Sequence, residues 1–197
     1  MSNQIQTKGI ETNSKNWSIT YNAKFTLSFC IIAFVTVILN LVFGGLINQS
    51  FALNPNIQIR EIYRLLTYVF CHGNFDHLLG NFFYLLMLGP ILEEKYGAKL
   101  LTIMTVITAI VTGLLNALLF NNGIIGASGI VFMFIILSSI VNMRSKEIPL
   151  TFIFIVVIYL GKEVYNSFSA DDISQFAHIF GGLCGGALGF LFNTNKS

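Results

Sequence analysis

The chain has 197 residues, of which 54% are hydrophobic and only 10% are charged, and its mean hydropathy is +0.73. In a soluble domain roughly a quarter of the residues are charged. This composition therefore excludes an ordinary soluble protein and indicates a single domain in lipid. The net charge of +2 gives no support to a nucleic-acid partner. The three cysteines, without CxxC or Cys/His clusters, favour neither a disulfide framework nor a zinc site.

Residues 1–24 are polar and lack the apolar stretch of a signal peptide, so we expect a short cytoplasmic tail. A transmembrane helix needs about 20 apolar residues. The rest of the chain contains six such runs, approximately 25–47, 77–92, 100–120, 127–143, 149–160 and 176–192. The second, fourth and sixth are short and contain polar residues or glycines, which is typical of helices surrounded by protein. The predicted fold is an all-α bundle of six transmembrane helices over 25–193, with a cytoplasmic tail at 194–197.

Basic residues are distributed unevenly between the predicted loops. With the N-terminus in the cytoplasm, eight of the eleven Lys and Arg residues fall on the inner side, and only Arg60, Arg64 and Lys162 fall on the outer side. This asymmetry agrees with the positive-inside rule and predicts that both termini are cytoplasmic. The lack of an N-terminal transit signal and the minimal size lead us to expect a bacterial inner membrane as the location, with a eukaryotic membrane as the alternative.

The predicted outer loop at 48–76 is long for a membrane protein, and its later part is amphipathic. Arg60 and Arg64 are four residues apart and should share one face of a helix. Apolar residues supply another face, and we expect this segment to lie in the outer membrane interface rather than to cross the bilayer. An ordinary solvated loop is the alternative. The apolar residues are Ile62, Leu65, Leu66, Val69 and Phe70.

Polar side chains at the start of the second run indicate a functional site, because such groups are costly in lipid. His77 and Asn81 are four residues apart and project from one helix face, with His72 just before them. His77 and Asn81 can both donate side-chain hydrogen bonds to a developing negative charge. A metal site is less favoured, because the two histidines are poorly spaced for one face and no carboxylate is placed to help them.

Ser128 begins the fourth run, within Gly126-Ala-Ser-Gly129 and directly after a turn at 121–123. A serine at a helix start can act as a nucleophile, and neighbouring backbone N–H groups can stabilise an oxyanion. The two glycines allow another chain to approach closely. The pattern is short, however, and alone it more often indicates a helix N-cap with packing glycines.

His178 opens a glycine-rich face in the sixth run. Gly181, Gly185 and Gly189 follow it at offsets of three, seven and eleven, so the four residues share one face. Small residues at this spacing bring two helices into backbone contact, and histidine is the usual general base for a serine. A buried histidine bonded to a carbonyl is the structural alternative. Because no Asp falls inside a span, the sequence favours a Ser–His dyad over a triad.

Together these motifs resemble those of the rhomboid family of intramembrane serine proteases. The matching stretches are His72…His77-Leu-Leu-Gly-Asn81, Gly126-Ala-Ser128-Gly129 and Ala177-His178-Ile-Phe-Gly181-Gly-Leu-Cys-Gly185. They occur in the family's order, on the second, fourth and sixth spans. In the first loop, Tyr63-Arg64 is similar to the family's Trp-Arg motif, with tyrosine in place of tryptophan. The resemblance covers about 25–192, and with six spans it is closest to the minimal form of the family.

The resemblance implies a role for each matching residue. Ser128 would be the nucleophile and His178 the general base, while His77, Asn81 and the Ser128 backbone N–H would form the oxyanion hole. Phe132 would stand where relatives often have a tyrosine stacked on the histidine, and it lacks that hydroxyl. The supporting positions would be His72, Gly126, Gly129, Gly181 and Gly185.

The implied reaction is peptide-bond hydrolysis within the bilayer, without a cofactor or a metal. Its substrate would be a single-span membrane protein whose helix unwinds near the outer face and enters from the lipid past the fifth helix and the 168–175 loop. One alternative is a catalytically inactive rhomboid-like protein that binds membrane clients, against which the intact Ser128 and His178 argue. Another is a small transporter, but the only candidate for its intramembrane carboxylate, Glu163, lies too close to the outer edge of the fifth span.

Overall fold

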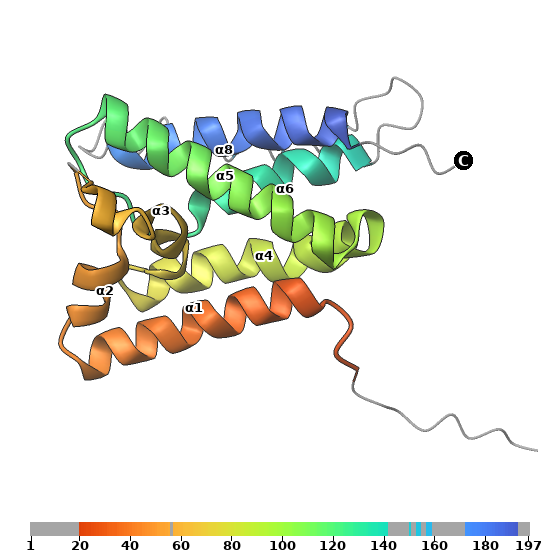
Figure 1. The fold of residues 1–197 in the computed structure, drawn as a ribbon. Coiled ribbons are helices and arrows are strands. Elements are labelled where there is room, and N and C mark those ends of the chain that lie inside the picture. Colours follow the sequence, from red (N-terminus) through yellow and green to blue (C-terminus); the bar gives the residue numbers. More distant parts are fainter. Residues whose placement is uncertain are drawn as a thin grey trace, which may run out of the picture.

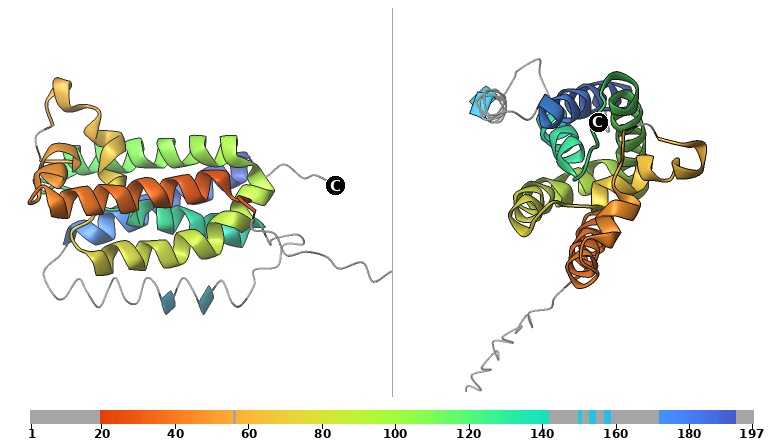
Figure 2. Two further views of the ribbon diagram at one scale, coloured as in Figure 1. Left: turned by 90° about the horizontal axis from the view of Figure 1, so that it is seen from below. Right: turned by 90° about the vertical axis from the view of Figure 1, so that its left-hand side faces the viewer.

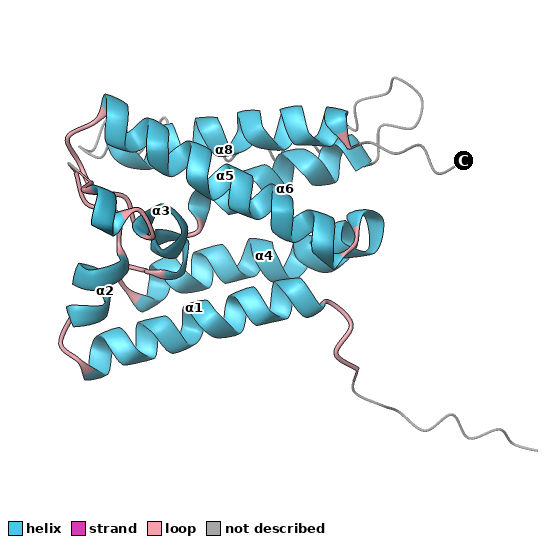
Figure 3. Cartoon of the chain, in the orientation of Figure 1, coloured by secondary structure: helices cyan, strands magenta, loops and turns pink. Residues whose placement is uncertain are grey.

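The computed structural model describes residues 20–55, 57–141, 150, 153–154, 157–158 and 172–192. Its helices are α1 Lys24–Val42, α2 Leu46–Phe51, η1 Ile59–Glu61, α3 Arg64–Thr67, η2 Tyr68–Phe70, α4 Phe75–Tyr96, α5 Ala98–Leu119, α6 Ser128–Val141 and α8 Asp172–Leu191, where η denotes a 3-10 helix. The longer helices lie side by side, and the short ones gather at one end of the bundle (Figures 1 and 3). Within these ranges the only β-type pairing is an isolated bridge between Leu53 and Ile124. The predicted all-α fold class is confirmed.

Three of the described helices, α1, α4 and α5, are long and apolar enough to cross a membrane. The helices α6 and α8 contain shorter apolar stretches. These lengths support a multi-pass membrane protein, since about 20 residues cross the hydrocarbon. The fifth predicted run, 149–160, falls mostly outside the described residues, so the total of six spans stays a prediction.

The ends of the first two predicted runs were wrong, and glycines explain part of the difference. Gly44 and Gly45 have φ angles of +58° and +94°, so α1 ends before them and the chain turns into the separate helix α2. The helix α4 is longer than its predicted run. Asn74 caps its start, and Gly97, with φ of +78°, ends it.

The helix α6 lies in the middle of the bundle, where α4, α5 and α8 pack around it (Figure 2). Every side chain from Ile130 to Ile135 is buried, which confirms that this short run is surrounded by protein. In contrast, α1, α4 and α5 expose large apolar side chains such as Leu41, Phe83 and Leu118. The expectation that the second run, now α4, is surrounded by protein was therefore wrong. Apolar surface of this kind is suited to contact with lipid.

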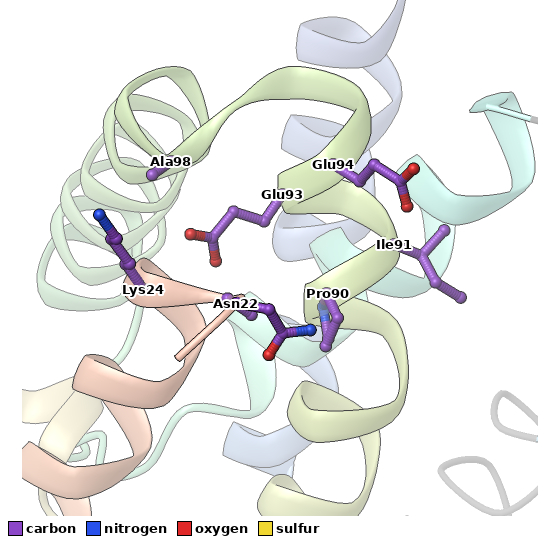
Figure 4. A pocket seen from close by; sticks show the side chains of 8 residues that line it. Asn22, Lys24, Pro90, Ile91, Glu93, Glu94 and Ala98 are labelled. Atoms are coloured by element: carbon purple, nitrogen blue, oxygen red, sulfur yellow. The ribbon is translucent and has the colours of Figure 1, made fainter. Parts of the chain in front are cut away.

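The start of α1 is held by a carboxylate from α4. Glu93, near the end of α4, accepts hydrogen bonds from the backbone N–H groups of Phe25 and Thr26 at 2.9 and 3.1 Å and from the Thr26 hydroxyl at 3.0 Å. It satisfies first-turn donors that the N-cap Ala23 leaves without a side-chain bond. Figure 4 shows Glu93 pointing toward the start of α1, beside a hollow of about 490 Å³ that Lys24 also lines. This contact locks α1 against α4 at the predicted inner end of the bundle.

We call residues 48–71 the outer connection, and one buried arginine organises it. The Nη1 atom of Arg64 donates to the carbonyl oxygens of Gln49 and Ala52 at 2.9 and 2.7 Å, and its Nη2 atom lies 3.2 Å from the Glu61 carboxylate. The prediction that Arg60 and Arg64 share a face was wrong, because Arg60 is exposed and Arg64 is only 7% exposed. The segment consists of three short helical pieces instead of one helix, so the spacing of a continuous helix does not apply. The connection projects from the side of the bundle (Figure 2).

Candidate active site

The segment 120–127 delivers Ser128 to the first position of α6. Its backbone pairs with the outer connection: the Leu53 and Ile124 N–H groups donate to each other's carbonyl oxygens at 3.1 and 2.9 Å. Gly126 then adopts a φ angle of +109°, a conformation that residues with a Cβ rarely take. After this turn Ser128 is half-buried at the helix start, between buried neighbours. The backbone turn at Gly126 therefore places the serine at the start of a buried helix.

His77 reaches this turn from α4. The Asn74 side chain caps α4 by accepting the His77 N–H at 2.7 Å, which fixes where the helix begins. The imidazole of His77 lies against Gly126, since a Cβ added to that glycine would be 2.6 Å from Cε1 and 2.8 Å from Nε2. The structure thus brings His77 into contact with the residue two positions before Ser128.

Asn81 lies one turn after His77 and is buried. Its Nδ2 atom donates to the His77 carbonyl oxygen at 3.1 Å, within the same helix. One of its two amide hydrogens is therefore engaged on its own backbone, and a side-chain amide can donate a second hydrogen bond.

His72 is buried behind His77, with a side chain only 1% exposed. Its Nδ1 atom lies 3.2 Å from the Phe70 carbonyl oxygen, and its ring meets the His77 ring edge-on at 5.1 Å between centroids. Burial, and secondarily the neighbouring His77, lower the pKa of His72 from 6.5 to about 4, although the bond to the Phe70 carbonyl opposes the shift. A neutral His72 therefore backs the His77 ring at physiological pH.

This pKa predicts an acid-sensitive stability. Above pH 6.5 neither state binds a proton at His72. Between pH 6.5 and 4 only the unfolded chain binds a proton at His72. The free energy of unfolding therefore decreases as pH falls, by up to about 3 kcal/mol. We expect wild type to lose about 2 kcal/mol more than His72→Asn between pH 7 and 4.5, measured by chemical unfolding in detergent. Parallel stability curves for the two proteins would contradict this.

Glycines bring α6 and α8 into backbone contact. A Cβ added to Gly181 would collide with the carbonyl oxygen of Gly129, and one added to Gly185 would lie 2.8 Å from the carbonyl oxygen of Met133. Gly182 lies against the ring of Phe132, which is itself buried. The two helices therefore touch directly beside Ser128, as small residues allow in membranes.

His178 belongs to α8 and precedes Gly181 by three residues. Its side chain lies outside the described residues, as do residues 168–171 of the predicted entry loop. Residues 172–175 of that predicted loop are helical instead, because α8 begins at Asp172. Its position is known only through the helix backbone, and its predicted role as a base remains a prediction.

Two positioning residues were missed in the sequence. Asn74 carries a recognisable signal, because an Asn just before an apolar helical run is a typical N-cap. Tyr68 carries none: its carbonyl oxygen accepts the Gly126 N–H at 3.0 Å, a contact between residues 58 positions apart. Only the tertiary fold shows that the outer connection touches the serine turn.

Comparison with known proteins identifies the family of this chain. The sequence profile of the Rhomboid domain matches residues 59–195. Rhomboid-like protease 1 of Toxoplasma gondii is 31% identical over 147 residues, covering 71% of this chain and 50% of the relative. The putative rhomboid protease YdcA of Bacillus subtilis is 32% identical over 140 residues, covering 68% and 69% of the two chains.

More distant relatives share a smaller part of their length. The rhomboid protease GlpG of Yersinia pestis is 28% identical over 109 residues, covering 54% of this chain and 39% of the relative. The match spans about half the length of the Toxoplasma protein. The profile match nevertheless covers well over half of this chain and includes all three motifs. The chain therefore belongs to the rhomboid family, whose intramembrane proteases it resembles in sequence and in helical fold.

Proposed function

We propose that this protein is an intramembrane serine endopeptidase that cleaves the transmembrane segments of single-span membrane proteins. One observation carries the proposal: both glycines that flank Ala127-Ser128 are in contact with another of the three motifs. The His77 ring lies on Gly126, and Gly181 lies on the Gly129 carbonyl. Three motifs far apart in sequence thus meet around one serine, as a catalytic site requires.

The packing register supports His178 as the general base. Gly129 lies opposite Gly181 and Met133 lies opposite Gly185, so α6 and α8 run in the same direction. Continued by one turn toward the start of both helices, this register leads to position 178 on α8 and to the turn that precedes Ser128 on α6. A Ser–His dyad is the arrangement that this register favours, with no metal or cofactor in the proposed reaction.

In the proposed mechanism His178 takes the Ser128 proton as the hydroxyl oxygen attacks a substrate carbonyl. The negative charge on that oxygen would be stabilised by the His77 side chain, the second Asn81 amide hydrogen and the Ser128 backbone N–H. One good donor of this kind accelerates the reaction by about 10²–10³-fold. His178 would then protonate the leaving amine, and water would hydrolyse the acyl-enzyme.

A cavity of about 270 Å³ lies between α4 and α6, two to three turns along α6 from Ser128, and we propose that the substrate enters laterally from the lipid on this side. Residues of α4 and α6, together with Ile158, line it: Phe83, Tyr84, Met87, Leu88, Ile135 and Ser138. Its walls are mostly apolar, which suits a helical segment that still has its backbone hydrogen bonds satisfied. For the orientation we propose cytoplasmic termini, which the positive-inside distribution supports.

The test is a reconstituted assay. The full chain in liposomes is incubated with a single-span reporter and, separately, with a fluorophosphonate, and peptide mass mapping locates the adduct. We expect cleaved reporter and a single adduct on Ser128. An unlabelled protein that binds the reporter without cutting it would overturn the proposal in favour of the client-binding alternative.

A further inference from the structure

The outer connection touches the segment that delivers Ser128 at successive points. Leu53 pairs with Ile124 through two backbone hydrogen bonds, and the Tyr68 carbonyl oxygen accepts the Gly126 N–H at 3.0 Å. Gly123 lies against the same Leu53, since an added Cβ would be 2.7 Å from its carbonyl oxygen. The serine turn is therefore held by main-chain contacts from a part of the chain that supplies no catalytic group.

Tyr68 connects these contacts to the bundle. Its side chain is only 2% exposed, and its hydroxyl donates to the Ala109 carbonyl oxygen of α5 at 3.2 Å. A Cβ added to Gly113, one turn further along α5, would lie 3.1–3.3 Å from Leu65, Tyr68 and Leu53. Burial, and secondarily Cys184, raise the pKa of Tyr68, so its hydroxyl remains a donor across the physiological range. Tyr68 is therefore hydrogen-bonded to α5 through its hydroxyl and to Gly126 through its backbone carbonyl oxygen.

We propose that Tyr68 is a positioning residue that sets the reactivity of Ser128 by tying the Gly126 turn to α5. The inference rests on the proposed function, because it assumes that Ser128 is the nucleophile. Tyr68 acts through Gly126, whose other face carries the His77 ring. Loosening this one turn would therefore disturb both the nucleophile and an oxyanion donor.

The expected size of the effect follows from catalytic geometry. Displacing a reacting group by about 1 Å lowers a rate by about 100-fold. Loss of the Tyr68 hydroxyl leaves the ring in place, and the Ala109 carbonyl keeps its helical hydrogen bond. The turn would be loosened without being displaced, so we expect Tyr68→Phe to slow fluorophosphonate labelling of Ser128 by about tenfold.

Tyr63→Phe is the matched control. The Tyr63 hydroxyl also donates to a carbonyl within the outer connection, that of Ser50 at 3.0 Å, and its side chain is 42% exposed. Within the described part of the chain, the Tyr63 ring meets the Phe51 ring and the Arg64 guanidinium, which both belong to the outer connection. Both variants lose one tyrosine hydroxyl, so only an effect specific to the serine turn can separate them.

Two readouts decide the inference, with labelling rates taken per folded molecule. Amide hydrogen exchange over 120–127 should accelerate in Tyr68→Phe and not in Tyr63→Phe, because the Ile124 and Gly126 amides are bonded to the outer connection. Equal exchange rates in both variants would show that Tyr68 does not hold the Gly126 turn against α5, whether or not the protein is a protease. Faster exchange with an unchanged labelling rate would overturn the role in reactivity. If wild type is not labelled at all, the proposed function fails, and so does the role of Tyr68 in the reactivity of Ser128. The exchange data would still decide whether Tyr68 holds the Gly126 turn against α5.

Discussion

Replacing Ser128 by alanine is expected to slow cleavage of a single-span reporter by at least about 10⁴-fold. The substitution removes the only atom that could form the acyl-enzyme, and enzymes of this chemistry lose about 10⁴–10⁶-fold in rate when the nucleophile is removed. His178→Ala should lose a similar factor. The double variant should lose no more than either single one, since nucleophile and base act as a unit. Initial rates of reporter cleavage in liposomes measure all three variants.

Ser139→Ala is the control for this series. Ser139 lies on the same helix, is buried, and donates to the Ile135 carbonyl oxygen at 2.7 Å. It lies about three turns away from Ser128 along α6, so its loss should change the cleavage rate by less than about twofold. Equal cleavage by wild type and Ser128→Ala would end the protease assignment. An equal loss in Ser139→Ala would show that the assay responds to damage to α6 in general.

Gly181→Ala is expected to lower cleavage by about 100-fold and the free energy of unfolding by about 2 kcal/mol. The added methyl group would collide with the Gly129 carbonyl oxygen, and it would also lie 2.8 Å from the carbonyl carbon and 2.9 Å from Cα. Backbone atoms cannot rotate away, so α8 must move off α6 beside Ser128. Overpacking of this kind destabilises by about 1–3 kcal/mol, and the shift separates the proposed dyad.

Gly186→Ala provides a matched control on the same helix. Among the described residues, a Cβ at Gly186 would meet one atom, the Ile136 Cγ2, at 3.9 Å, which is ordinary contact. Both substitutions raise helix propensity by the same amount, so a difference between them reports the contact with Gly129 alone. Cleavage rates and unfolding in detergent measure both variants. Wild-type activity in Gly181→Ala would show that the close approach of α6 and α8 is unnecessary for the chemistry.

The sequence predicted helix boundaries correctly where neighbouring residues mark the end of the apolar stretch. The third and fourth runs agree with α5 and α6 to within a few residues, because each is a continuous apolar stretch bounded by polar or glycine residues. The first run failed at its end, because apolar residues continue across the turn at Gly44 and Gly45 and composition alone does not show it. The position of Arg64 was predicted wrongly because helical spacing applies to one continuous helix, whereas this segment forms three short pieces. In that arrangement the Arg64 side chain turns inward to the carbonyl oxygens of Gln49 and Ala52.

By itself, the sequence determined that the chain lies in lipid, that it is helical, and which polar residues are candidates for chemistry. These properties depend on composition and on spacing within one helix, both of which are local. Only the tertiary structure decided that the His77 ring lies on Gly126, that Gly181 meets Gly129, and that Tyr68 holds the serine turn. Each of these contacts joins residues more than 45 positions apart, so it depends on how helices pack against one another, a property that no local pattern encodes.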